Sequence, residues 1–168
     1  MKAIGVLIAI ALALALQTTL ARFLVGGTAA LDLVLVVVVY VALTSGPVTG
    51  MFAGSLAGMI QDALSSGVIG VGGLAKSLVG FLAGAVGQQF IVTAALPRFV
   101  MFLAATAVHA MVFMGLYGLL GSRSFSSPWA AIASQGLGNA AVGMIAFAVI
   151  ESLPGVVERR RTGRRTKH

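Results

Sequence analysis

The chain has 168 residues, of which 59% are hydrophobic and only 9% are charged, and its formal net charge is +7. Soluble domains carry roughly 25% charged residues, so this composition excludes a soluble globular domain and predicts an integral membrane protein. The positive charge is concentrated in the last ten residues without interleaved aromatic residues, so we expect no nucleic-acid binding. The absence of cysteine excludes a disulfide framework and a thiolate metal site.

Continuous apolar runs such as 34–39 indicate helices, because the strands of a membrane barrel alternate apolar with polar residues. One span needs about 20 residues, so the chain has room for about six. We therefore predict an all-α bundle of six transmembrane helices within residues 1–155, followed by a basic tail over 156–168. The predicted segments are 3–21, 31–45, 47–62, 74–92, 97–121 and 128–153.

The first apolar run follows Lys2 and ends in a polar stretch that reaches Arg22. A cleaved signal peptide is the alternative, since Ala11-Leu12-Ala13 fits a small-x-small cleavage pattern. Five further apolar segments favour a retained helix. The second and third segments are short, so we expect them to be tilted, partly re-entrant or covered by their neighbours.

Glycines recur at helical spacing in three segments. Close approach of helix backbones replaces the hydrophobic drive between helices in lipid, so such stripes predict helix–helix contact. We expect packing within one subunit, or a stripe on the third segment that receives a partner's helix. The residues are Gly50, Gly54 and Gly58 on the third segment, Gly80 and Gly84 on the fourth, and Gly136 and Gly143 on the sixth.

Asp62 and Lys76 flank a glycine-rich loop, 65–73, between the third and fourth segments. A charge in the membrane is costly, and two opposite charges reduce each other's cost. We therefore expect an ion pair between Asp62 and Lys76 that pins this hairpin. The alternatives are a substrate-binding or relay role and two unpaired interfacial charges.

The remaining polar residues inside the segments are His109, Gln135 and Asn139, which we expect to be buried and to form hydrogen bonds between helices. No second histidine or nearby carboxylate completes a metal set with His109. No nucleophile, base and orienting group can be assembled either. The sequence thus predicts no catalytic residues, no metal and no cofactor.

Orientation follows from the basic residues. An even number of spans puts Lys2, Arg98 and the tail on one side, against Arg22 and Arg123 on the other. The positive-inside rule then predicts that both termini are cytoplasmic. We expect the basic tail residues to contact anionic lipids or a cytoplasmic partner: Arg159, Arg160, Arg161, Arg164, Arg165 and Lys167.

Residues 54–67, GSLAGMIQDALSSG, followed by residues 70–81, GVGGLAKSLVGF, resemble the rod-shape-determining protein MreD family. In that family a helix ending in aspartate leads into a Ser/Gly-rich loop, and a helix opening on a GLxKxLVGxLAG-like phrase follows, as in residues 73–84. The chain length, the six-span layout, the end of the first helix and the basic tail are similar too.

The resemblance implies a non-enzymatic scaffold of the bacterial cell-elongation machinery, or rod complex, in the inner membrane. Such a protein acts in cell shape and peptidoglycan synthesis. It lies beside the single-pass protein MreC and connects MreB filaments with the RodA glycosyltransferase and its partner transpeptidase. On this reading, the glycine stripe of the third segment is expected to face MreC or a second copy of the chain in a homodimer.

The layout is also similar to the six-helix substrate-capture subunits of energy-coupling-factor vitamin transporters. The alternative function is therefore capture of a small substrate in an extracytoplasmic cavity, with residues 65–73 as its roof. Glycine stripes could contact MreC or a transporter subunit equally well, so they do not discriminate between the two functions.

Overall fold

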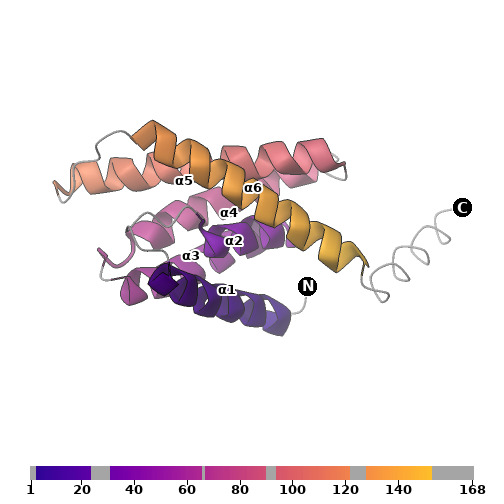
Figure 1. Cartoon of the computed structure of the whole chain (residues 1–168), viewed down its shortest axis with the longest axis horizontal. Coiled ribbons are helices and arrows are strands. Elements are labelled where there is room, and N and C mark those ends of the chain that lie inside the picture. The colour runs from indigo at the N-terminus through magenta and orange to yellow at the C-terminus, as the bar shows by residue number, and fades with distance from the viewer. Residues whose placement is uncertain (1–2, 24–30, 66, 90–93, 122–127, 153–168) are drawn as a thin grey trace, which may run out of the picture.

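The structure, a computed structural model, describes residues 3–23, 31–65, 67–89, 94–121 and 128–152. In this part of the chain, six helices form an all-α bundle (Figure 1), as predicted. The helices are α1 (Ala3–Phe23), α2 (Leu33–Ser45), α3 (Pro47–Leu64), α4 (Val71–Gln89), α5 (Ala95–Leu119) and α6 (Pro128–Ser152).

The helix bounds lie within three residues of the predicted segments, and α4 differs most. It begins at Val71, so Gly72 and Gly73 are helical and the loop after α3 is shorter than predicted. The predicted segment began only at residue 74, because glycine disfavours helix interiors and the glycines before it were therefore assigned to the loop. In the structure this first turn is capped by an aspartate side chain from α3, described below.

Four of the helices are long and apolar enough to cross a membrane: Ala3–Leu20 within α1, Val71–Gln89, Ala95–Leu119 and Trp129–Ser152 within α6. The chain is therefore a multi-pass membrane protein with at least these four candidate spans. Helix α2 has only 13 residues, or about 20 Å at 1.5 Å per residue, against a hydrocarbon core of about 30 Å.

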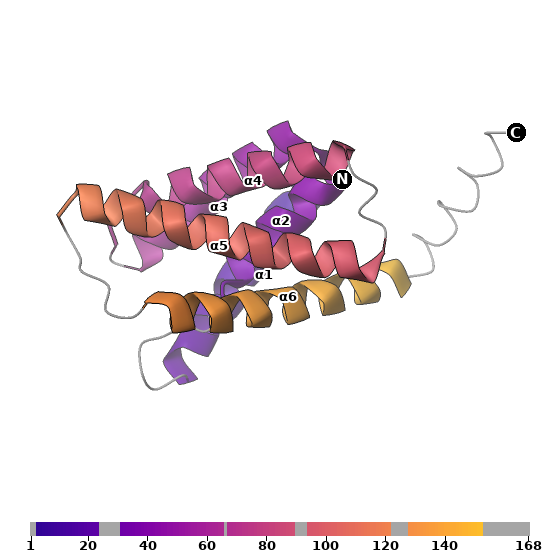
Figure 2. The ribbon, with the colours of Figure 1, turned by 90° about the horizontal axis from the view of Figure 1, so that it is seen from above.

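Helix α2 lies at the centre of the bundle, where it packs against each of the other five helices. Its Val34, Val38, Val39 and Val41 side chains are completely buried. A helix that is apolar on every side needs cover on every side. Neighbouring helices supply that cover for α2, which explains how so short a helix is accommodated (Figure 2).

The connection from α2 to α3 is a single residue, Gly46, with φ of 93°. Only glycine adopts this left-handed region without strain. The Gly46 amide donates to the Ala42 carbonyl, which closes α2, and Pro47 supplies the preset backbone angle for the first turn of α3. This sharp turn folds α3 back beside α2.

The predicted glycine stripe of α3 packs against α4 within the same chain. A Cβ atom at Gly50 would lie 2.5 Å from the Gly80 carbonyl oxygen, and one at Gly58 would lie 2.5 Å from that of Gly72. A Cβ at Gly54 would overlap the Lys76 carbonyl. The expectation that this stripe faces MreC or a second copy is therefore wrong: the face is buried against α4, because backbone contact leaves no room for a further helix.

The other predicted glycines also pack inside the chain. A Cβ at Gly84 would overlap Pro47, at the start of α3. On α6, Gly143 faces the Phe102 ring of α5 too closely to admit a methyl group, whereas a Cβ at Gly136 would lie 3.2 Å from Leu103. Small residues thus set the α5–α6 contact as well as the α3–α4 contact.

The start of α1 and the end of α6 lie at the same end of the bundle, on the right in Figure 1. The basic tail, including Arg159, Arg160, Arg161, Arg164, Arg165 and Lys167, lies outside the described residues, as does Arg123. The predicted contacts of the tail with anionic lipids or a cytoplasmic partner stay predictions.

The α3–α4 packing predicts that Gly54→Ala lowers stability by about 1–3 kcal/mol, because the added methyl group meets rigid backbone. The midpoint of thermal unfolding of the purified protein in detergent would fall by several degrees. Gly115→Ala is the matched control, since a Cβ at this helical position of α5 meets nothing within 4 Å. Equal midpoints for the two variants would contradict this account of the packing.

Candidate functional site

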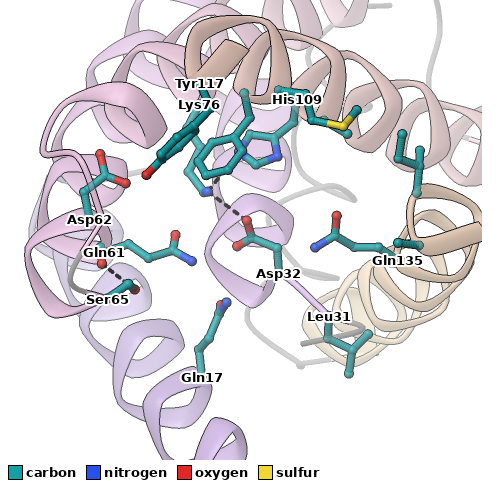
Figure 3. Close-up of a pocket in the computed structure, with 16 residues that line it drawn as sticks. Gln17, Leu31, Asp32, Gln61, Asp62, Ser65, Lys76, His109, Tyr117 and Gln135 are labelled. Carbon is teal, nitrogen blue, oxygen red and sulfur yellow. Dashed lines mark hydrogen bonds and ion pairs between the residues drawn. The ribbon is translucent and has the colours of Figure 1, made fainter. Parts of the chain in front are cut away.

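Most of the predicted polar side chains gather at the end of the bundle opposite to the start of α1 and the end of α6. There the last turns of α1, α3 and α5 meet the first turns of α2, α4 and α6 around a cavity of about 340 Å³ (Figure 3). Asp32, Asp62, Lys76, His109 and Gln135 all line it. The structure therefore brings most of the predicted polar residues to one place.

Lys76 pairs with Asp32. Its Nζ lies 2.7 Å from the Asp32 Oδ2, and the two side chains are only 3% and 5% exposed. The predicted pairing of Lys76 with Asp62 is wrong, because Asp62 forms other bonds. A buried ammonium without a counter-ion costs several kcal/mol, so this pair ties α4 to the start of α2.

Asp62 caps helix α4. Its Oδ2 accepts backbone N–H bonds from Gly70 at 2.9 Å, Gly72 at 2.9 Å and Gly73 at 3.2 Å. The first amides of a helix have no partner within the helix and carry partial positive charge, so a carboxylate is a favourable acceptor there. The α3–α4 hairpin is therefore pinned by a carboxylate bound to backbone amides rather than by an ion pair.

Asp32 has two further structural roles. Its Oδ1 accepts from the Leu35 amide at 2.9 Å, which makes Asp32 the N-cap of α2. Its own amide donates to the Asn139 Oδ1 at 2.8 Å. The Asn139 Nδ2 then donates to the Thr106 hydroxyl at 3.1 Å. Through its carboxylate and its backbone amide together, this one residue connects α2, α4, α5 and α6.

His109 is held in one tautomer by Lys76. Its Nε2 lies 3.2 Å from the Lys76 Nζ. An ammonium only donates hydrogen bonds, so the Nε2 must accept and the proton of the neutral ring resides on Nδ1. The Nδ1 is buried and has no hydrogen-bond partner, and the same is true of the Gln61 Oε1 in the cavity wall.

Of the remaining predicted residues, one lines the cavity and one is buried in the hydrogen-bond network. Asn139 is completely buried in the network, whereas Gln135 is half-buried and points toward Asp32 across the cavity in Figure 3. Gln17 of α1 also lines the cavity, and its Oε1 accepts from the Val34 amide at 3.2 Å. Among the described residues, no three histidine, cysteine or acidic side chains are grouped to hold a metal.

A second ionic contact lies at the opposite end of the bundle. Arg98 of α5 donates to both carboxylate oxygens of Glu151 on α6, at 3.0 and 2.7 Å. Its guanidinium also lies 4.4 Å from the centroid of the Phe147 ring. Bidentate geometry and a cation–π contact make this a strong clamp between α5 and α6.

Sequence reasoning missed Asp32 as the partner of Lys76. A signal was available, because Asp32 precedes an apolar helix by one residue and is one of only four acidic residues in the chain. Gln61 and Tyr117 were also missed. The Tyr117 hydroxyl accepts from the Val68 amide at 3.0 Å and so holds the loop after α3 against α5.

The ion pair predicts non-additive effects in a double-mutant cycle. Lys76→Met or Asp32→Asn alone leaves the partner charge buried and should cost about 3–5 kcal/mol. The double variant should cost clearly less than the sum. Unfolding by SDS titration in mixed micelles measures each free energy. The control cycle pairs Lys76→Met with Asp62→Asn, for which the effects should add to within about 0.5 kcal/mol; strong coupling there would contradict the pairing.

The cap predicts that Asp62→Ala removes the shared acceptor of three backbone amides. Loss of a cap costs about 0.5–2 kcal/mol. Hydrogen exchange should therefore accelerate at Gly70, Gly72 and Gly73 while α5 stays protected. Ser65→Ala is the matched control, since the Ser65 hydroxyl only donates to the Gln61 carbonyl. Unchanged exchange in Asp62→Ala would show that Asp62 does not cap α4.

One protein family has a model that matches this chain. The model is described as rod shape-determining protein MreD, and it matches residues 2–151 of the 168 residues. No curated protein and no solved structure matches the chain significantly. The matched region contains α1 to α5, all of α6 except its last residue, and every residue of the cavity wall named above.

Proposed function

The chain belongs to the family of the rod shape-determining protein MreD, and from that premise we propose that it is a non-enzymatic membrane scaffold of the bacterial cell-elongation complex. Membership of the family supports a role in rod shape determination. The match over residues 2–151 is the observation that carries the proposal, since it covers the helical bundle up to the last residue of α6 rather than a single motif.

In the proposed role, the protein lies in the bacterial inner membrane with both termini in the cytoplasm. It pairs with MreC and connects MreB filaments to RodA and its transpeptidase, and thereby to peptidoglycan synthesis. The basic tail contacts anionic lipids at the cytoplasmic face, because its arginines and lysine attract negative headgroups.

The polar chemistry of the bundle supports this role. Three sets of ionised side chains form contacts between helices: Asp32 with Lys76, Asp62 with the start of α4, and Arg98 with Glu151. Such contacts fix the relative positions of the helices, which is what a scaffold requires of its own core.

Affinity purification from native membranes in mild detergent tests the proposal. The tagged full-length chain should recover MreC together with RodA and the transpeptidase, identified by mass spectrometry. Gly115→Ala should recover the same proteins, because its added methyl group meets nothing within 4 Å. Asp32→Asn, which disrupts the network, should lose most of that recovery.

A different set of recovered proteins would contradict the scaffold proposal. Recovery of cytoplasmic ATPases and a coupling membrane subunit, in place of MreC, would overturn the scaffold proposal. It would identify the chain as a substrate-capture subunit of an energy-coupling-factor transporter instead.

A further inference from the structure

Three glutamines line the cavity at the polar end of the bundle, each from a different helix. They are Gln17 of α1, Gln61 of α3 and Gln135 of α6. Each is half-buried, and all three amide groups point toward Asp32 in Figure 3. We propose that this cavity binds an uncharged ring that carries several hydroxyl groups, as in a simple sugar. The inference goes beyond the scaffold role and does not rest on it, because it concerns the isolated chain.

The glutamine amides are open to hydrogen bonding. Within the described residues, neither polar atom of the Gln135 amide has a hydrogen-bond partner, and neither atom is buried. The Nε2 atoms of Gln17 and Gln61 are also unpaired and accessible, whereas the Gln17 Oε1 accepts from the Val34 amide. Polar side chains inside a membrane bundle ordinarily bond to a neighbouring helix. Three open amides around one cavity therefore indicate a polar occupant.

The charges around the cavity favour an uncharged occupant. Lys76 and Asp32 neutralise each other at 2.7 Å and are almost completely buried. The Asp62 Oδ2 is bound by three backbone amides, whose partial positive charge offsets the carboxylate. The Asp62 Oδ1 is accessible and has no partner in the described part of the chain, so it can accept from a hydroxyl. An ionic ligand would lose its hydration without gaining a full counter-charge.

Much of the wall that α5 and α6 contribute is apolar. Phe113 and Met114 of α5 and Ile132 of α6 line the cavity there, and the Phe113 and Tyr117 ring centroids lie 4.7 Å apart. A sugar ring has C–H groups on its faces and hydroxyls on its edge, so a wall divided between apolar side chains and amides suits it. Each hydroxyl both donates and accepts, as amide side chains do. The cavity volume of about 340 Å³ lies in the range of small-molecule sites, about 300–1,000 Å³.

Ligands that share a six-membered ring test the inference. Saturation-transfer NMR measures binding to the full chain in lipid nanodiscs, with empty nanodiscs as the background. At least one of glucose, galactose and mannose should show saturable transfer. Tetrahydropyran-2-methanol keeps the ring but only one hydroxyl, so it should bind at least about tenfold more weakly than that hexose. Glucuronate and glucosamine, which carry a charge, should also bind more weakly.

Variants of the wall locate the binding. Gln135→Leu removes an amide that forms no bond within the described fold, so it should weaken hexose binding about three- to tenfold without lowering stability. Gln61→Leu removes a second open amide and should act similarly. Gln89→Leu is the matched control, because this exposed glutamine ends α4 away from the cavity and should leave binding unchanged.

The same ring occurs as a free sugar and as the headgroup of a membrane glycolipid, and a competition experiment distinguishes these sources. If the cavity admits a headgroup, monoglucosyldiacylglycerol in the nanodisc should displace the bound hexose, whereas diacylglycerol should not. If the glycolipid does not compete, the ligand is a free sugar. Either result supports the proposed ligand class and identifies its source.

Three results would overturn the inference. The first is the absence of saturable transfer to all three hexoses, which would show that the amides are satisfied by water alone. The second is binding of tetrahydropyran-2-methanol or of a charged sugar at least as tight as that of the hexoses. The third is unchanged hexose binding in both Gln135→Leu and Gln61→Leu. None of them bears on the scaffold proposal, which is tested by the proteins recovered from native membranes.

Discussion

A lysine ammonium buried inside a membrane bundle requires a counter-ion, and that requirement organises the rest of this structure. Lys76 extends from the first turns of α4 into the polar end of the bundle, where Asp32 neutralises it at 2.7 Å. Asp32 occupies the N-cap of α2, so the pair fixes where the central helix begins relative to α4. The Asn139 and Thr106 bonds extend the same constraint to α5 and α6. One polar network thus links four helices and fixes their relative positions.

Glycine contacts supply the complementary constraint. At Gly50, Gly54 and Gly58 the backbones of α3 and α4 touch, which places the Lys76 backbone directly on α3 and leaves its side chain to reach toward Asp32. At the opposite end, Arg98 and Glu151 clamp α5 to α6. Dispersion between close backbones therefore holds the helix pairs, and charges at the helix ends select how the pairs are arranged. Both kinds of contact serve a protein whose family acts in rod shape determination.

Composition and apolar runs were sufficient to predict an all-helical bundle with six helices, since each long apolar run must satisfy its own backbone in lipid. The family could also be predicted from the phrase around Asp62 and Lys76, and the family match confirms it. The partner of Lys76 could not be predicted. Asp62 is much closer in sequence than Asp32, and only the register of α4 on α3 shows that backbone amides occupy Asp62 instead. The α3 stripe was similarly ambiguous, because glycines predict close contact without naming the helix that makes it.

The claim that Asp32 neutralises Lys76 can be measured directly in lipid bilayers, because the chain has only three lysines and two aspartates. Solid-state NMR on protein labelled with ¹⁵N at lysine Nζ and ¹³C at aspartate Cγ reports dipolar couplings between these few atoms. The structure predicts one strong coupling, from the Lys76 Nζ to the Asp32 Cγ, that persists in Asp62→Asn and disappears in Asp32→Asn. A strong coupling that instead disappears in Asp62→Asn would contradict the account.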